Sequence, residues 1–243
     1  MKNSTLSAII FGIAIVLAAY LLGNSIINRN KPQGNISVTG LGKENFTSDL
    51  IVWEGSFSKE NSNLQEAYIG LEKDKKEIKE YLFSKGINEK ELVFDAVTSH
   101  NKTRAKYVDG KYTGEEFLGY RLTQSLTIES KEVEKVEKIS REITELLNKG
   151  IQFYSQPPRY YYTKLADLKV EMISKATEDA RIRAEKIADN SGGDLGRLIS
   201  AKMGIFQITG QNSNENFSWG GTYNTSSKEK TASITMKLNY EVD

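Results

Sequence analysis

Residues 164–193 read KLADLKVEMISKATEDARIRAEKIADNSGG, the most regular stretch of the chain. Apolar residues recur every three or four positions, as on one face of an α-helix, and they are Leu165, Leu168, Met172, Ala176, Ala180, Ala184, Ile187 and Ala188. Gly192-Gly193 is typical of a helix end. The pattern predicts a long amphipathic helix over 164–190. Its four alanines, spaced by four, favour close packing on the chain's own sheet, with helix–helix assembly between copies as the alternative.

Two further helices precede this one. The first can be capped by Asn61, Ser62 or Asn63 and ends at Lys85-Gly86; its apolar stripe is Leu64, Ala67, Tyr68, Leu71, Ile78 and Leu82. The second covers about 131–148 and stops at Gly150; its expected inward residues are Val133, Val136, Ser140, Ile143 and Leu147. Both patterns have the period of an α-helix with one buried face.

Strand-like segments separate the helices. Residues 36–40 and 46–57 predict two strands joined by a turn at Gly40-Leu41-Gly42. Residues 92–107 and 117–129 predict a long hairpin that turns around Asp109-Gly110-Lys111 and Gly114. Further strands are expected at 151–154, 160–162, 197–209 and 231–242.

The order of these elements predicts the fold class. A strand, a long helix and a long hairpin occur around 46–129 and again around 151–242, with the helix at 131–148 between them. We therefore expect an α+β fold of antiparallel sheets, with long helices packed on one face and two pseudo-repeated halves. The halves share a pattern of elements but no sequence identity.

Four aromatic residues are candidates for an interface. Phe217 and Trp219 lie in the Asn-, Ser- and Gly-rich segment 210–230, which predicts a long surface loop or a disordered tip. Tyr160 and Tyr162 lie on one side of a short strand after two prolines. They either pack on their own domain or contact a second copy or a partner, because aromatic residues often anchor interfaces.

The N-terminal segment predicts a membrane anchor. No charge occurs between Asn3 and Asn28, and Leu6 to Gly23 is an apolar run. A helix of about 20 apolar residues crosses a bilayer, and the anchor residues are Leu6, Ile10, Phe11, Ile15, Leu17, Leu21 and Leu22. The expected domains are an anchor at 1–27, a linker at 28–35 and one α+β domain at 36–243. A cleaved signal peptide and a buried helix are the alternatives.

The expected location is the bacterial inner membrane, crossed once, with the C-terminal domain in the periplasm. Lys2 precedes the helix and Arg29 and Lys31 follow it, so the positive-inside rule is nearly balanced. Export of the domain is favoured because the tail before the helix is short and the whole domain follows it. The lipid bilayer is then one partner of the chain.

The residues that usually carry chemistry are scarce. The chain has no cysteine, and His100 is its single histidine, so a metal site lacks the usual ligands. No G-x-S-x-G elbow occurs, and the near-zero net charge excludes a basic nucleic-acid footprint. The acidic clusters are typical of solvated faces and turns: Glu115-Glu116, Glu178-Asp179 and Glu132, Glu134 and Glu137. We expect no catalytic, cofactor-binding or metal-binding residue and no enzymatic activity.

Three segments resemble one protein family. The opening ISVTGLG at 36–42, the helix and its end at 176–193 (ATEDARIRAEKIADNSGG) and the following DLGRLI at 194–199 are similar to segments of the SIMPL domain proteins. The resemblance covers about 36–242. It departs from the family pattern at Gln156-Pro157-Pro158 and at the long segment 210–230.

The resemblance implies an exported, envelope-associated α+β protein that tends to self-assemble, with no catalytic residues to transfer. Some members of the family are linked to oxidative-stress tolerance. The expected function is therefore that of a non-enzymatic envelope protein that forms a homo-oligomer or docks an envelope protein partner. The alternative is a monomeric periplasmic module that binds a ligand or protects against stress.

Overall fold

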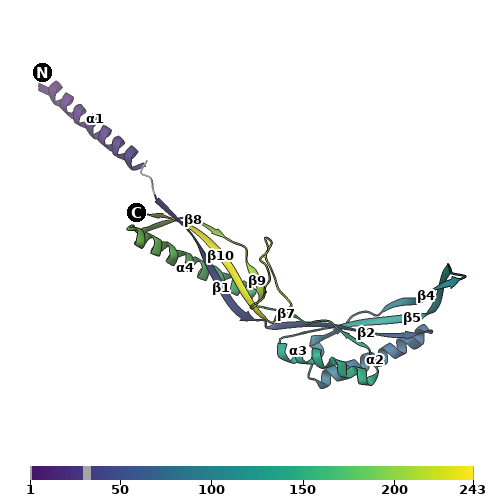
Figure 1. The fold of residues 1–243 in the computed structure, drawn as a ribbon. Helices are drawn as coiled ribbons and strands as arrows, with labels where there is room; N and C mark the ends of the chain where they lie inside the picture. The colour runs from purple at the N-terminus through teal and green to yellow at the C-terminus, as the bar shows by residue number, and fades with distance from the viewer. Residues whose placement is uncertain (1, 30–33, 243) are drawn as a thin grey trace. The chain divides into compact units, whose positions relative to one another are not determined.

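The computed structural model describes residues 2–29 and 34–242, and the side chains of these residues except 2–9 and 26–29. It has an α+β fold with antiparallel sheets and four α-helices in the described residues (Figure 1). The chain divides into a first unit (1–41, 177–203 and 236–243) and a second unit (42–176 and 204–235). The structure therefore confirms the expected fold class as α+β with antiparallel sheets.

The N-terminal helix α1 covers Lys2–Arg29. Its described apolar side chains are mostly exposed, including those of Ile10, Phe11, Ile15, Leu17, Leu21 and Leu22. Within the part of the chain whose side chains are described, no helix combines the length and the apolar character that a membrane span needs. The side chain of Leu6 and residues 30–33 of the expected linker lie outside the described residues.

A six-stranded antiparallel sheet is the centre of the second unit. Its central strands are β2 (Leu50–Asn61) and β5 (Lys111–Ser130). The shorter strands β3 (Leu92–Phe94) and β4 (Thr98–Val108) pair with β5, whereas β6 (Phe153–Ser155) and β7 (Arg159–Tyr161) pair with β2. Sequence analysis predicted one strand over 92–107, but residues 95–97 interrupt it.

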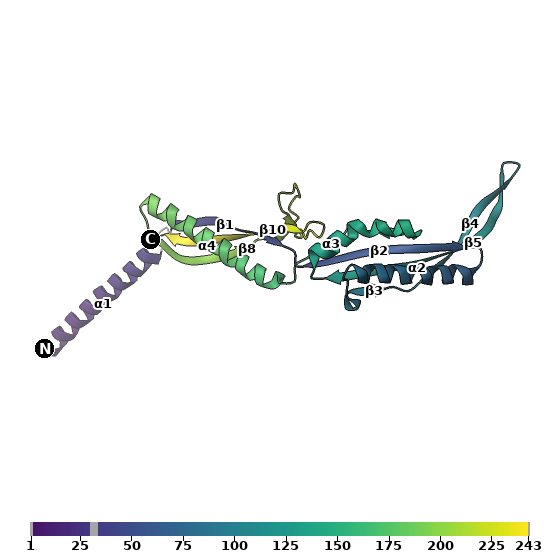
Figure 2. The same cartoon turned by 90° about the horizontal axis from the view of Figure 1, so that it is seen from below.

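Two helices cover one face of this sheet, α2 (Leu64–Ser84) and α3 (Val133–Glu142), as Figures 1 and 2 show. A 3-10 turn, η1 (Glu89–Glu91), leads into β3. Alternate residues of β2 are buried against the helices, because side chains alternate between the faces of a strand. The largest fully buried side chains of this core include Trp53, Phe57, Leu71, Ile78 and Leu126.

The ends of α2 follow the sequence signals. Asn63 is the N-cap, and its side-chain oxygen accepts hydrogen bonds from the backbone N–H groups of Gln65 and Glu66 at 2.8 and 3.2 Å. Gly86 follows the C-cap residue with φ +90°. The predicted stripe is buried from Ala67 onward except at Tyr68, which is half exposed, as is Leu64. These two residues line an open groove with Tyr120 at the start of α2, although Ala67 between them is fully buried in the core.

The second predicted helix changes its winding. α3 ends at Glu142, and η2 (Ile143–Lys149) continues as a 3-10 helix that stops at Gly150 with φ +73°. A 3-10 helix has 3.0 residues per turn, so a residue three positions after Ile143 returns to the same face. Leu146 is therefore fully buried and Leu147 is 57% exposed, which corrects the expectation that Leu147 faces inward.

The four-stranded antiparallel sheet has the order β1-β10-β8, and β9 also pairs with β10. Its strands are β1 (Gly34–Thr47), β8 (Leu195–Met203), β9 (Gln207–Gly210) and β10 (Glu229–Val242). Sequence analysis placed the strands at 151–162 in the second pseudo-repeated half. In the structure these strands belong to the other sheet, because β6 and β7 pair with β2. The N-terminal strand β1 pairs with β10 instead.

The helix α4 (Leu165–Ser191) confirms the prediction made from its sequence. Ala176, Ala180, Ala184 and Ala188 are fully buried within the single chain, which supports packing on the chain's own sheet. Ile187 is an exception, since its side chain is half exposed. Gly192 has φ +83° and ends the helix, as the two glycines predicted.

The predicted turn at Gly40-Leu41-Gly42 is wrong, because β1 continues through it to Thr47. Gly42 has another role. A Cβ atom at this position would lie 2.4 Å from the carbonyl oxygen of Met172 and 3.2 Å from the backbone nitrogen of Ala176. The glycine therefore permits the backbones of β1 and α4 to approach each other closely.

Candidate interaction site

The segment 211–228 between β9 and β10 is an ordered loop of the second unit. Residues 222–224 of the loop form backbone hydrogen bonds with β9. The Ile208 N–H donates to the Thr222 carbonyl at 2.7 Å, and the Asn224 N–H donates to the Ile208 carbonyl at 2.9 Å. The Tyr160 N–H donates to the Thr225 carbonyl at 2.7 Å. The structure thus agrees with the surface loop among the two sequence-based alternatives.

Gln207 holds the apex of the loop through its side-chain amide. The amide nitrogen donates to the Ser218 carbonyl at 2.8 Å. The amide oxygen accepts from the N–H groups of Ser218 and Thr222 at 3.3 and 2.8 Å. Gly221 completes the turn with φ +92°, a conformation that favours glycine. Trp219 is one of the three residues between Ser218 and Thr222, and its side chain is 96% exposed.

The four predicted interface residues do not form one surface. Phe217 and Trp219 are exposed on the loop, as the contact hypothesis requires. Tyr160 is buried and belongs to the core of the second unit, so its proposed role in an interface is wrong. The ring of Tyr162 packs on Phe46 with 4.8 Å between the ring centroids, which agrees with packing on its own domain.

Two exposed apolar residues on or beside the loop were missed by sequence analysis, Ile205 and Tyr223. Tyr223 could have been found, because it is a third aromatic residue in the same polar segment. Ile205 has no such signal, since only the fold places it against Gly221. We call Ile205, Phe217, Trp219 and Tyr223 together the Trp219 patch.

A buried lysine lies at the base of the loop. Lys230 is fully buried at the start of β10, its ammonium donates to the Ser227 carbonyl, and it lies 6.0 Å from the centroid of the Tyr160 ring. Burial lowers the pKa of Lys230 to about 8, partly opposed by the negative charges of Glu215 and Glu229. A buried ammonium costs free energy unless it is fully paired, so this residue is an unusual support for the loop.

Ion pairs attach the end of the loop to α3. The ammonium of Lys228 lies 3.2 Å from Glu137 and 3.7 Å from Glu134. The pKa of Glu137 is lowered although burial opposes the shift, because Arg141 and Lys228 donate hydrogen bonds to its carboxylate. One of the acidic clusters expected to be solvated thus has a structural contact.

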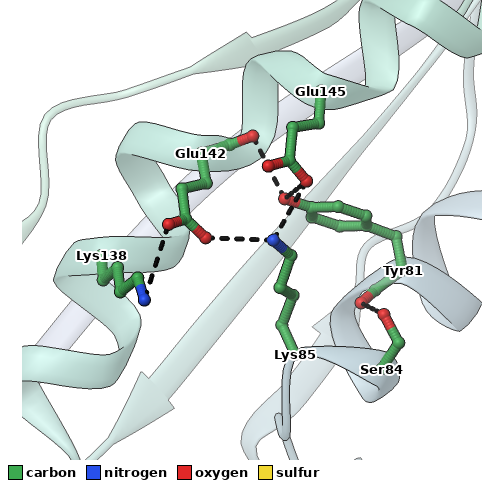
Figure 3. Close-up of polar contacts among 6 residues, drawn as sticks. All are labelled: Tyr81, Ser84, Lys85, Lys138, Glu142 and Glu145. Carbon is green, nitrogen blue, oxygen red and sulfur yellow. Dashed lines mark hydrogen bonds and ion pairs between the residues drawn. The ribbon is translucent and has the colours of Figure 1, made fainter.

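A second charged cluster joins the end of α2 to α3 and η2 (Figure 3). Lys85 lies 3.0 Å from both Glu142 and Glu145, and the Tyr81 hydroxyl donates to the Glu142 carbonyl and the Glu145 carboxylate at 3.1 Å. Hydrogen bonds from Lys85 and Tyr81 lower the pKa of Glu145. Burial raises the pKa of Tyr81. Both glutamates are thus paired with Lys85, and these contacts join the end of α2 to α3 and η2.

Within residues 2–29 and 34–242 we find no group of three His, Asp or Glu side chains arranged to hold a metal ion. His100 lies on the exposed strand β4. The most exposed aromatic side chain of the described residues is that of Trp219, on a loop held by hydrogen bonds from Gln207. Preorganised aromatic side chains of this kind are the usual anchors of protein interfaces.

The fold and this site define an α+β protein with two antiparallel sheets and a hydrogen-bonded loop that exposes Phe217 and Trp219. The sequence profile of the SIMPL family, described as a protein of unknown function (DUF541), matches residues 36–240. The chain therefore belongs to the SIMPL family, as the resemblance indicated. No curated protein matches the chain.

Proposed function

We propose that the protein is a membrane-anchored, non-enzymatic envelope protein whose SIMPL domain assembles into a homo-oligomer through the Trp219 patch. The observation that carries this proposal is the exposure of Trp219 on a loop that Gln207 holds in place. The hydrogen bonds of Gln207 hold the backbone on both sides of Trp219, so mainly the two χ angles of the indole lose freedom when a second surface covers it, and its burial can contribute strongly to binding.

The strand β8 supports assembly independently. In the described sheet β8 pairs only with β10, so its other edge is open. Leu198, Ile199 and Met203 are about half exposed along this strand. An open edge with apolar side chains is a surface that another chain can cover.

The helix α1 supports the anchor. It has 28 residues, and the segment between Asn3 and Asn28 lacks charge. At about 1.5 Å per residue the apolar run from Leu6 to Gly23 would be about 27 Å long as a helix, close to the roughly 30 Å of the apolar part of a bilayer. In this proposal the helix lies in the bacterial inner membrane and the domain lies in the periplasm. Tethering raises the local concentration of the domain and thereby favours weak assembly contacts.

The size of the full chain in detergent micelles tests the assembly. Light scattering coupled to size-exclusion chromatography should give a multiple of the chain mass, and Trp219→Ala should shift the equilibrium toward the monomer by about 30-fold, the effect of a residue that contributes about 2 kcal/mol. Tyr154→Ala removes an aromatic side chain that is 55% exposed elsewhere on the second unit, and should leave the mass unchanged. A wild-type chain that is monomeric at high micromolar concentration would refute self-assembly.

Membrane attachment and orientation need separate measurements. The full chain should stay in the membrane pellet after alkaline washing, and protease added to spheroplasts should digest the domain. Protection of the domain in intact spheroplasts, with digestion only after lysis, would contradict the periplasmic orientation.

The second candidate is a monomeric periplasmic module that binds a ligand or protects against envelope stress. A groove of about 680 Å³ at the start of α2, lined by Leu64, Tyr68, Tyr120 and polar neighbours, favours it. A monomeric wild-type chain whose Tyr68→Ala variant loses stress protection in cells would favour this candidate. A stress role for the assembled form rests on the family resemblance and is part of the proposal.

A further inference from the structure

The hairpin of β4 and β5 extends as a two-stranded ribbon with two exposed faces. Every residue of β4, from Thr98 to Val108, is exposed, and so is nearly all of β5 before Gly119. Figures 1 and 2 show the ribbon continuing beyond the helices that cover the rest of the sheet. Asp109 and Gly110 form the tight turn at its tip, with φ 49° and 74°. An isolated two-stranded ribbon is only marginally stable in water, so a partner surface would stabilise it.

One face of the ribbon is aromatic. Tyr107 lies opposite Tyr112, with 5.9 Å between ring centroids, and Phe117 contacts Tyr120 at 5.0 Å. This face continues the helix-covered side of the sheet past the start of α2. Tyr107, Tyr112 and Phe117 are each at least half exposed.

The other face is rich in basic side chains, several of them paired with glutamates, and Asp109 adds a negative charge at the tip. Side chains alternate along a strand, so four successive even-numbered residues of β4 share this face; they are His100, Lys102, Arg104 and Lys106. Arg121 lies opposite His100 and Lys111 opposite Val108. Glu116 pairs with Arg104, and Glu60 pairs with both Lys102 and Arg121. Within the described residues Lys106 and Lys111 form no ion pair, although both flank the tip.

The free edge of β4 is poorly suited to accept another strand. Within the described sheet β4 pairs only with β5, and the register shifts after Lys102 and again after Lys106. Such irregularities, together with Lys and Arg along an edge strand, are devices that discourage strand addition. The faces of the ribbon, rather than its edge, are therefore the surfaces available for a contact.

We infer that the tip of this ribbon binds the surface of an anionic lipid bilayer. Tyrosine has an apolar ring and a polar hydroxyl, and it is enriched at the level of the lipid headgroups. Lysine and arginine on the opposite face can extend their long stems to reach lipid phosphates. The bilayer surface provides apolar and anionic layers side by side, which matches the two faces of the ribbon. This contact is independent of the N-terminal anchor and of the Trp219 patch.

A fluorescent label at the tip tests the inference. The chain has no cysteine, so Val108→Cys gives one attachment point for an environment-sensitive dye. The full chain is held in nanodiscs of phosphatidylcholine and mixed with vesicles of equal parts phosphatidylcholine and phosphatidylglycerol, or of phosphatidylcholine alone. The emission should shift to the blue only with the anionic vesicles, and the response should weaken as salt is raised.

Matched variants separate the contributions of charge and ring. Lys106→Gln with Lys111→Gln should weaken vesicle binding about 30-fold, because each lysine near an anionic surface contributes about fivefold. Lys76→Gln with Lys138→Gln removes the same charge from exposed positions on α2 and α3 and should change binding little. Tyr107→Ser with Tyr112→Ser should abolish the blue shift. The emission of buried Trp53 verifies that each variant is folded.

Four results would each overturn the inference. One is the absence of a response to anionic vesicles, and another is an equal response to both kinds of vesicle. The third is an equal effect of the two lysine pairs on binding. The fourth is a blue shift that grows with protein concentration in the absence of vesicles, which would assign the ribbon to a contact between copies of the chain.

Discussion

Lys230→Met should remove a pH dependence of stability that the wild-type protein shows between pH 8 and 10. Lys230 is fully buried, and burial lowers its pKa to about 8, whereas an exposed lysine in the unfolded chain has a pKa of about 10.4. Between these two values the unfolded chain binds more protons than the folded chain. Raising the pH through this window therefore favours the folded state.

The magnitude follows from the difference between the two pKa values. Each unit corresponds to 1.36 kcal/mol, so the free energy of unfolding of the wild type should rise by about 2.5 kcal/mol from pH 7 to pH 10. This is a large fraction of the 5–15 kcal/mol that stabilises a typical domain. Methionine has a similar length and carries no charge, so Lys230→Met should be as stable as the wild type or more stable at pH 7.

Urea denaturation followed by the emission of Trp53 provides the measurement. Trp53 is buried in the core of the second unit, whereas Trp219 is already exposed when folded and changes little on unfolding. The groups that face Lys230 are Glu215, Glu229 and Tyr160, and they remain in both proteins. The difference between the two proteins therefore isolates Lys230. Equal slopes against pH for wild type and variant would refute the reasoning.

Three further substitutions test contacts of the second unit, each by its urea midpoint. Gly42→Ala should destabilise the protein by about 2 kcal/mol or more, because the added methyl group overlaps the Met172 carbonyl. The control Gly34→Ala in the same strand meets only an ordinary van der Waals contact. Similar losses of stability for the two variants would exclude the close approach of β1 and α4. Tyr81→Phe should lower the free energy of unfolding by about 1 kcal/mol, because it removes the hydroxyl hydrogen bonds shown in Figure 3. An unchanged free energy of unfolding would mean that water replaces these hydrogen bonds. Asn63→Ala should cost about 1 kcal/mol as a lost N-cap, and Asn63→Asp should restore it.

The candidate site could be predicted from the sequence only in part. Phe217 and Trp219 were identifiable, because large aromatic residues are unusual in a polar loop. Tyr160 was not, since its short strand has the same pattern whether it lies at a surface or in the core. Its burial depends on pairing with β2, which is more than 100 residues earlier in the chain. The clamp made by Gln207 has no local signature either, because its partners lie 11 and 15 residues away.

Local interactions determined the structural features that the sequence alone could establish: the helical face of α4, the caps of α2 and the hairpin turn at Asp109-Gly110. Each depends on residues within about one or two turns of one another, and their side chains and backbone preferences carry the signal. Contacts between distant segments decided the rest. In the sequence Gly42 has the pattern of a turn residue, but in the structure it lies against the Met172 carbonyl. Lys230 has the sequence context of a surface lysine, but in the structure it is fully buried at the base of the loop. Burial and close approach are properties of two surfaces, so only the tertiary structure reveals them.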